Sequence, residues 1–179
     1  MVTFDSCFDK VLGSEGAYVN DPADPGGETK FGISRRAHPN EDIAGLTVER
    51  ARAIYRRDYW DQLRAEELPQ ALRYWIFDTA VNCGTGFAGE SLQRACGVLP
   101  DGDIGPRTLS AASAVAPHAL LRLMFVDRAM RYALNPNDKR FGRGWFARLY
   151  DVLVLSLAMI DPRIRVSEAP ADIRFGSAQ

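Results

Sequence analysis

Two carboxylates and a hydroxyl stand close together near the start of the sequence, at Glu15, Asp24 and Thr29. Hydrolysis of a glycosidic bond needs a proton donor for the leaving oxygen and a second group that activates water or stabilises the cationic sugar. Glu15 follows an apolar segment, where partial burial would raise its pKa and keep it protonated near neutral pH. Asp24 lies in a segment rich in proline and glycine, and Thr29 offers a hydroxyl that can orient water. These residue types suit glycoside hydrolysis.

The same residues also have plainer interpretations. A glutamate at the end of a helix is more often solvated than catalytic. A second interpretation is a calcium site formed by Asp21, Asp24 and Glu28, although their spacing does not match the twelve-residue loop of an EF-hand. Residue types alone therefore leave catalysis, a solvated acidic segment and a cation site open.

The cysteines and histidines give no sign of a metal site or a cofactor. Cys7, Cys83 and Cys96 are odd in number, which excludes a closed disulfide framework. We expect Cys7 and Cys96 to lie on apolar helix faces as small core residues, with a Cys83–Cys96 bridge as the alternative. His38 and His118 are far apart in the sequence, so we expect no zinc site.

The charge of the chain is balanced overall but unevenly distributed. The 179 residues, 46% hydrophobic and 25% charged, suit one soluble domain or one domain with a small appendage. The net charge of −1 does not point to nucleic acid. Basic residues are concentrated between residues 120 and 148. They form either a basic face that attracts an anionic polymer or a membrane surface, or an ordinary solvated helix surface. These bases are Arg122, Arg128, Arg131, Lys139, Arg140, Arg143 and Arg148.

No targeting or membrane segment is expected. Residues 1–7 lack the basic and apolar regions of a signal peptide, and the longest apolar stretch, 152–160, is too short to span a bilayer. We therefore expect synthesis in the cytoplasm without a signal peptide, and no integral membrane segment.

Apolar periodicity predicts a mainly α fold, with at most a small β-hairpin near residues 16–33. Thr47 is the expected N-cap of a helix that continues to Trp60, and Thr108 that of a short helix after the loop 100–106. The other expected helices begin near Phe4 and cover about 68–83, 87–96, 117–134 and 141–160.

The run from Glu15 to Ser34, EGAYVNDPADPGGETKFGIS, resembles the signature of the glycoside hydrolase family 108 muramidases, which include phage endolysins. A near-continuous match over twenty residues is far more specific than a short motif. The resemblance implies a lysozyme-like fold with Glu15 as the catalytic acid. It also implies roles for Asp24 and Thr29, because the Glu–Asp–Thr triad of phage-type lysozymes has the same nine-residue offset from Glu15 to Asp24. The step from Asp24 to Thr29 is one residue shorter than in that triad, and Asp21 is a rival to Asp24.

Further resemblances extend along the chain. The run from Trp75 to Gly84 is similar to the family's second helix motif, in which an aspartate and an asparagine line the cleft wall. The substrate-binding residues expected on this basis are Tyr18, Asp78 and Asn82. Asn82 would hydrogen-bond an N-acetyl group or, equally, cap the helix before Gly84.

Residues 92–109 and 141–148 resemble the predicted peptidoglycan-binding region that is common in this family. We therefore expect a catalytic muramidase region, 1–90, and a helical predicted peptidoglycan-binding region, 91–179, packed together as one compact unit. The glycines of the loop 101–105 have a structural explanation as well, since they allow a sharp turn. Trp145 is expected in the core rather than as a platform for a sugar.

The resemblance implies a peptidoglycan hydrolase that cleaves the β-1,4 bond between N-acetylmuramic acid and N-acetylglucosamine, for cell lysis or wall remodelling. The alternatives are a lytic transglycosylase that uses Glu15 alone, and a non-catalytic wall-binding or secretion-assisting protein. The expected partners are glycan strands and a holin or secretion system for export, with no nucleic acid. We expect a monomer that needs no cofactor and acts at the cell wall or periplasm.

Overall fold

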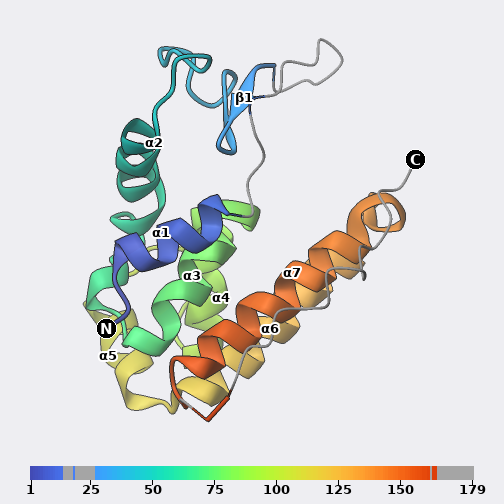
Figure 1. Cartoon of the computed structure of the whole chain (residues 1–179). Helices are drawn as coiled ribbons and strands as arrows, with labels where there is room; N and C mark the ends of the chain where they lie inside the picture. The colour runs from blue at the N-terminus through green and yellow to red at the C-terminus, as the bar shows by residue number, and fades with distance from the viewer. Residues whose placement is uncertain (14–17, 19–26, 162, 165–179) are drawn as a thin grey trace.

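The computed structural model describes residues 1–13, 18, 27–161, 163 and 164, and within them the chain is mainly helical (Figure 1). Two short antiparallel strands, β1 (Thr29–Lys30) and β2 (Ile33–Ser34), form a hairpin. The predicted fold class, mainly α with a small β-hairpin, is confirmed. The α-helices are α1 (Phe4–Leu12), α2 (Val48–Tyr55), α3 (Gln70–Cys83), α4 (Thr85–Cys96), α5 (Pro106–Ala114), α6 (Pro117–Ala133) and α7 (Asp138–Ala158).

Threonine side chains set the starts of α1 and α2. The Thr3 hydroxyl accepts a hydrogen bond from the Ser6 backbone N–H, and the Ser6 hydroxyl accepts one from the Thr3 backbone N–H. Thr47 accepts from the backbone N–H of Arg50, so the predicted N-cap is confirmed. Such caps satisfy backbone donors that the first helical turn leaves unpaired. Both helices therefore begin at defined residues.

A cluster of aromatic rings holds the N-terminal helices together. The Phe4 ring of α1 lies 5.5 Å from Trp60 and 5.8 Å from Phe77 of α3, in edge-to-face geometry. Trp60 ends the π-helical turn Arg56–Trp60, which follows α2 directly. Edge-to-face pairs at these distances add to the stability that burial of the rings already provides. The cluster thus fixes α1, which leads to the Glu15 segment in sequence, against α3.

Helix α3 is the centre of the molecule. It packs against α1, α4, α6 and α7, and residues 74–80 are all buried (Figure 1). A helix that is apolar on all sides belongs in a core. Asp78 and Thr79 are the polar members of this buried run, and burial of polar groups requires partners.

The second half of the chain is built from α4 to α7. Helices α6 and α7 are joined by a short connection and lie along each other (Figure 1). The Gln93 side chain of α4 is buried and holds the loop before α5, because its oxygen accepts from the Gly102 backbone N–H at 2.8 Å and its amide donates to the Asp103 carbonyl at 2.9 Å.

The prediction that Thr108 caps α5 is wrong. The helix begins at Pro106, with Gly105 as its N-cap, and Thr108 lies inside the first turn. Proline favours the first helical position because its φ suits the helix and it has no N–H to leave unpaired. The Thr108 hydroxyl instead accepts from the Gln93 amide at 3.3 Å.

The three cysteines are free thiols in the structure, so the alternative Cys83–Cys96 bridge is not formed. Cys7 is fully buried, and burial raises the pKa of its thiol to about 12, as suits a small core residue. In the described residues no single helix has the length and apolar character to cross a membrane, although α5 and α6 together, bent by 115°, do.

Candidate active site

The predicted site residues of the N-terminal segment lie at the edge of the described structure. Glu15 and Asp24 lie outside the described residues. The Tyr18 side chain is exposed, and its hydroxyl donates to the Glu28 carboxylate at 3.3 Å. Glu28 also forms an ion pair with Arg35 at 2.7 Å, so its charge is neutralised on the hairpin. Tyr18 is thereby connected to the start of the hairpin.

Thr29 is the first residue of β1 and pairs with Ser34 across the hairpin. Its half-buried hydroxyl donates to the Gly27 carbonyl at 3.5 Å, the limit of a hydrogen bond. The hairpin turn contains Phe31, whose φ of +52° is unusual for a residue with a side chain. Tyr55 of α2 secures this turn, because its hydroxyl donates to the Phe31 carbonyl at 2.9 Å. Thr29 is therefore carried by a hairpin that α2 holds in place.

Asp78 and Asn82 form a second group, on the C-terminal half of α3. Asp78 is 1% exposed. One of its carboxylate oxygens accepts from Arg128 of α6 at 2.8 Å, and the other accepts from Arg148 of α7 at 3.0 and 2.9 Å. Both oxygens are thus occupied inside the protein. This geometry favours an internal role for Asp78, and its predicted contact with substrate stays a prediction.

Asn82 lies one helical turn after Asp78, and its side chain is exposed. Its amide nitrogen donates to the Asp78 backbone carbonyl at 2.9 Å and to the Asp78 carboxylate at 3.3 Å. The helix ends instead at Gly84, whose N–H donates to the Ala80 carbonyl. Asn82 is therefore bonded back into α3 and available at the surface, which suits a binding residue better than a cap.

Of the bases assigned to a surface face, one is buried and a second is partly buried. Arg128 is fully buried, and it also donates to the Tyr132 hydroxyl at 2.8 Å and to Thr79 at 3.2 Å. Burial, the largest single effect, lowers the pKa of Arg128, but Asp78 acting together with Tyr132 and Cys83 outweighs it, and the pKa is raised. The side chain of Arg148 is 20% exposed. The prediction of a basic surface is therefore wrong for Arg128 and holds only in part for Arg148, and the residues that do expose their bases include Arg122, Arg131, Lys139 and Arg143.

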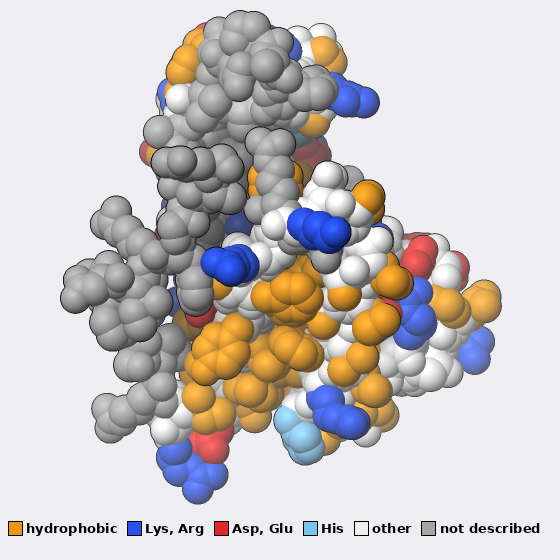
Figure 2. Space-filling model, turned by 90° about the vertical axis from the view of Figure 1, so that its right-hand side faces the viewer, with side chains coloured by type: hydrophobic (Ala, Val, Ile, Leu, Met, Phe, Trp, Pro, Cys, Tyr) orange, Lys and Arg blue, Asp and Glu red, His pale blue; other side chains and the backbone are white. Residues whose placement is uncertain are grey.

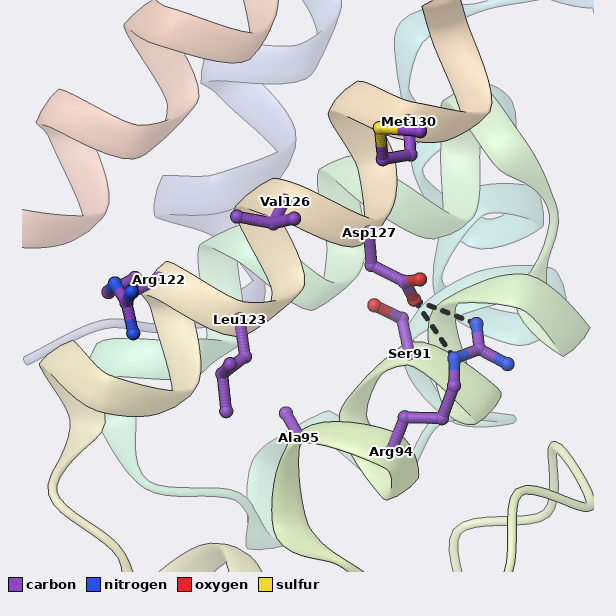
Figure 3. Close-up of a pocket in the computed structure, with 8 residues that line it drawn as sticks. All are labelled: Ser91, Arg94, Ala95, Arg122, Leu123, Val126, Asp127 and Met130. Carbon is purple, nitrogen blue, oxygen red and sulfur yellow. Dashed lines mark hydrogen bonds and ion pairs between the residues drawn. The ribbon is translucent and has the colours of Figure 1, made fainter. Parts of the chain in front are cut away.

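A pocket of about 350 Å³ lies between α4 and α6 and contains none of the predicted site residues (Figure 3). The Arg94–Asp127 ion pair, 2.7 Å long, stands at one side of it, and Leu123, Val126 and Met130 give it apolar walls. Hydrophobic side chains also gather on the face shown in Figure 2, bordered by lysine and arginine side chains. The residues that line the pocket between α4 and α6 do not include Asp78 or its partners Asn82, Arg128 and Arg148.

Comparison with known proteins assigns both halves of the chain. Residues 8–84 match glycosyl hydrolase 108, and residues 88–150 match a family described as a predicted peptidoglycan domain. The structure of SagA from Brucella abortus is 31% identical, with a TM-score of 0.78 over 87% of this chain and 94% of that one. The chain belongs to the glycosyl hydrolase 108 family. No curated protein matches it.

Membership of glycosyl hydrolase 108 confirms the resemblance found in the sequence and makes the protein a glycoside hydrolase that acts on peptidoglycan. The glycosyl hydrolase 108 match includes all the predicted site residues, from Glu15 to Asn82. The peptidoglycan-domain match includes Arg128 and Arg148, the partners of Asp78. The buried ion pairs therefore connect the two matched regions.

Proposed function

We propose that the protein is an N-acetylmuramidase that cleaves the β-1,4 bond between N-acetylmuramic acid and N-acetylglucosamine. The observation that carries the proposal is the glycosyl hydrolase 108 match over residues 8–84, which contains the run that begins at Glu15. Glu15 protonates the leaving oxygen as the general acid. Asp24 positions water or stabilises the positive charge that develops on the sugar.

Thr29 assists Asp24 by orienting the attacking water. Its hydroxyl is half-buried at the start of β1, on a hairpin held by Tyr55, and such anchoring favours a fixed direction for the hydroxyl. Carboxylates and a hydroxyl suffice for this hydrolysis, so the reaction uses no cofactor.

The second region, 91–179, contributes to the use of glycan strands as substrate and packs with the region 1–90 as one unit. The contacts of α3 with α4, α6 and α7 support this division into two tightly packed regions rather than two separate domains. The protein acts as a monomer at the cell wall or periplasm, in lysis or wall remodelling, after export by a holin or a secretion system.

The test is a digest of purified peptidoglycan, followed by borohydride reduction and mass spectrometry of the products. We expect new reducing ends on N-acetylmuramic acid. Glu15→Gln should lower the rate by about 10²–10⁴-fold, because the amide cannot donate an acidic proton. Glu49→Gln, which removes an exposed carboxylate from the first turn of α2, is the matched control and should leave the rate unchanged.

The products separate the alternatives. Anhydro-muramic ends would identify a lytic transglycosylase that uses Glu15 alone. Reducing ends on N-acetylglucosamine would contradict the proposed bond. Binding to the wall without release of any new ends, in both wild type and Glu15→Gln, would identify a non-catalytic protein.

A further inference from the structure

The Asp78 carboxylate is where three helices meet. Asp78 comes from α3, Arg128 from α6 and Arg148 from α7, and the shortest distances from Asp78 to the two guanidinium groups are 2.8 and 2.9 Å. Asp78 and Arg128 have 1% and 0% of their side chains exposed. Removal of such charged groups from water is costly. The junction therefore calls for an explanation other than stability.

Burial of an ion pair is a poor way to stabilise a fold. Apolar side chains of similar volume often give equal or greater stability at such positions, and buried charges are better attested as devices that fix one arrangement. Arg148 fits this role, since its Nε and Nη2 atoms both donate to one Asp78 oxygen while Arg128 holds the other, and together they fix the carboxylate. The question is which group the fixed carboxylate serves.

Asn82 is an exposed residue that contacts Asp78. Its neighbours at 2.9 and 3.3 Å are a backbone carbonyl and a carboxylate oxygen, which only accept hydrogen bonds. The NH₂ side of the amide must therefore face Asp78, and the Asn82 amide oxygen must face away from it. An exposed asparagine normally rotates freely about χ2. Here the contacts with Asp78 hold the Asn82 amide, so that its oxygen is presented as a hydrogen-bond acceptor in one fixed direction.

We infer that Asn82 is a specificity-determining residue whose amide oxygen accepts the N–H of a substrate acetamido group, and that Arg128 and Arg148 are positioning residues that act on it through Asp78. The inference rests on the proposed function for its substrate, and goes beyond it in assigning part of the binding site to the second region. That region supplies both arginines, so it completes the substrate site of the first.

A double-mutant cycle on soluble, uncross-linked glycan strands tests the inference. Asn82→Ala should raise KM about tenfold with little change in kcat, as expected for loss of one hydrogen bond made equally in ground and transition states. Arg148→Lys keeps the charge but loses the two-point contact, and should raise KM about fivefold. In the Asn82→Ala background, Arg148→Lys should raise KM by less than about twofold, because the effects of coupled residues are not additive.

Arg94→Lys is the matched control. Arg94 of α4 forms an ion pair with Asp127 of α6 and makes no contact with Asp78 in the described structure. This substitution should leave KM unchanged in both backgrounds. If Arg148→Lys raises KM by the same factor in the wild-type and Asn82→Ala backgrounds, the positioning role is overturned, whatever happens to the melting temperature. A wild-type KM for Asn82→Ala would overturn the specificity role.

A measurement on the free protein keeps this inference separate from the proposed function. In ¹⁵N-labelled full-length protein, the side-chain amide signals of Asn82 should shift in Arg148→Lys and stay in place in Arg94→Lys. If wild type releases no reducing ends, the proposed function fails while this comparison still decides the positioning role. Unmoved Asn82 signals in Arg148→Lys would overturn it.

Discussion

Asp21 and Asp24 compete for the role of second carboxylate, and single substitutions separate them. Asp24→Asn should lower kcat by at least about a hundredfold if Asp24 stabilises charge or positions water, since the amide removes the negative charge but keeps the shape. Asp21 precedes Pro22, where a side-chain hydrogen bond to the backbone is the expected role, so Asp21→Asn should lower stability more than rate. Initial rates of reducing-end release and thermal melts measure both effects.

The reverse ranking, with both variants folded, would move the catalytic role to Asp21. A loss of activity that follows the melting temperature in both variants would argue against a chemical role for either carboxylate. Asp42→Asn provides a control for a carboxylate that accepts a backbone hydrogen bond outside this segment, from the N–H of Gly45 at 3.1 Å.

Single residues were predictable where their partners are near in sequence. Asp78 and Asn82 are one helical turn apart, and the sequence placed both on one helix. The burial of Arg128 was missed because its partner Asp78 lies on another helix, although its helical spacing from Leu121, Met124 and Tyr132 puts it on a buried face. Arginine is rarely buried without a partner, so burial can be argued only when the partner is known.

At the scale of elements, the contact between α4 and the loop before α5 is unusually close. A Cβ added at Gly89 would lie 2.3 Å from the Gly102 carbonyl oxygen. Gly89→Ala must therefore push the loop away from α4, and should lower the free energy of unfolding by about 1–3 kcal/mol. Urea denaturation of the variant and the wild type measures the difference.

Gly144→Ala is the matched control for this substitution. Gly144 lies within α7, and among the described residues no atom outside its own helix backbone lies within 4 Å of the Cβ that alanine would add, so alanine should raise the free energy of unfolding by about 0.5–1 kcal/mol through helix propensity alone. A Gly89→Ala protein as stable as wild type would mean that the loop yields freely. A destabilised Gly144→Ala protein would mean that another contact requires this glycine.

Helix boundaries followed from the sequence where local chemistry decides them. Thr47 caps α2 as predicted, because the capping bond joins residues three apart. The start of α5 was misplaced because Pro106 and Thr108 both carry start signals, and Thr108 is drawn into the core by Gln93. The π-helical turn Arg56–Trp60 carries no local signal, since the burial of Trp60 against Phe4 depends on a distant helix.

At the scale of the whole molecule, the two family matches meet between residues 84 and 88, yet the core does not divide there. The Trp75 ring of α3 lies 6.4 Å from Phe125 of α6, and α3 packs on α4, α6 and α7. A fragment of residues 1–97 would expose this face of α3 and leave Asp78 without its arginines. We expect the fragment to show no cooperative thermal transition by circular dichroism.

A cooperatively folded and active 1–97 fragment would contradict this prediction and establish 1–90 as an independent domain. The full chain, melted under the same conditions, is the control. Amphipathic spacing was sufficient to predict the mainly α class, but not which helix lies at the centre. That depends on how the α-helices of the described residues share one core, which no local pattern specifies.

The long sequence separation of the Asp78 contacts also orders events during synthesis. Asp78 and Arg148 are seventy residues apart, and Thr79 and Arg128 forty-nine. Contacts between such distant residues require closure of long loops and form slowly, after local helices. While the ribosome is still making α7, Asp78 has no Arg148 to bind. A nascent chain therefore lacks the buried junction of Asp78, Arg128 and Arg148 until α7 has been made and has docked on α3.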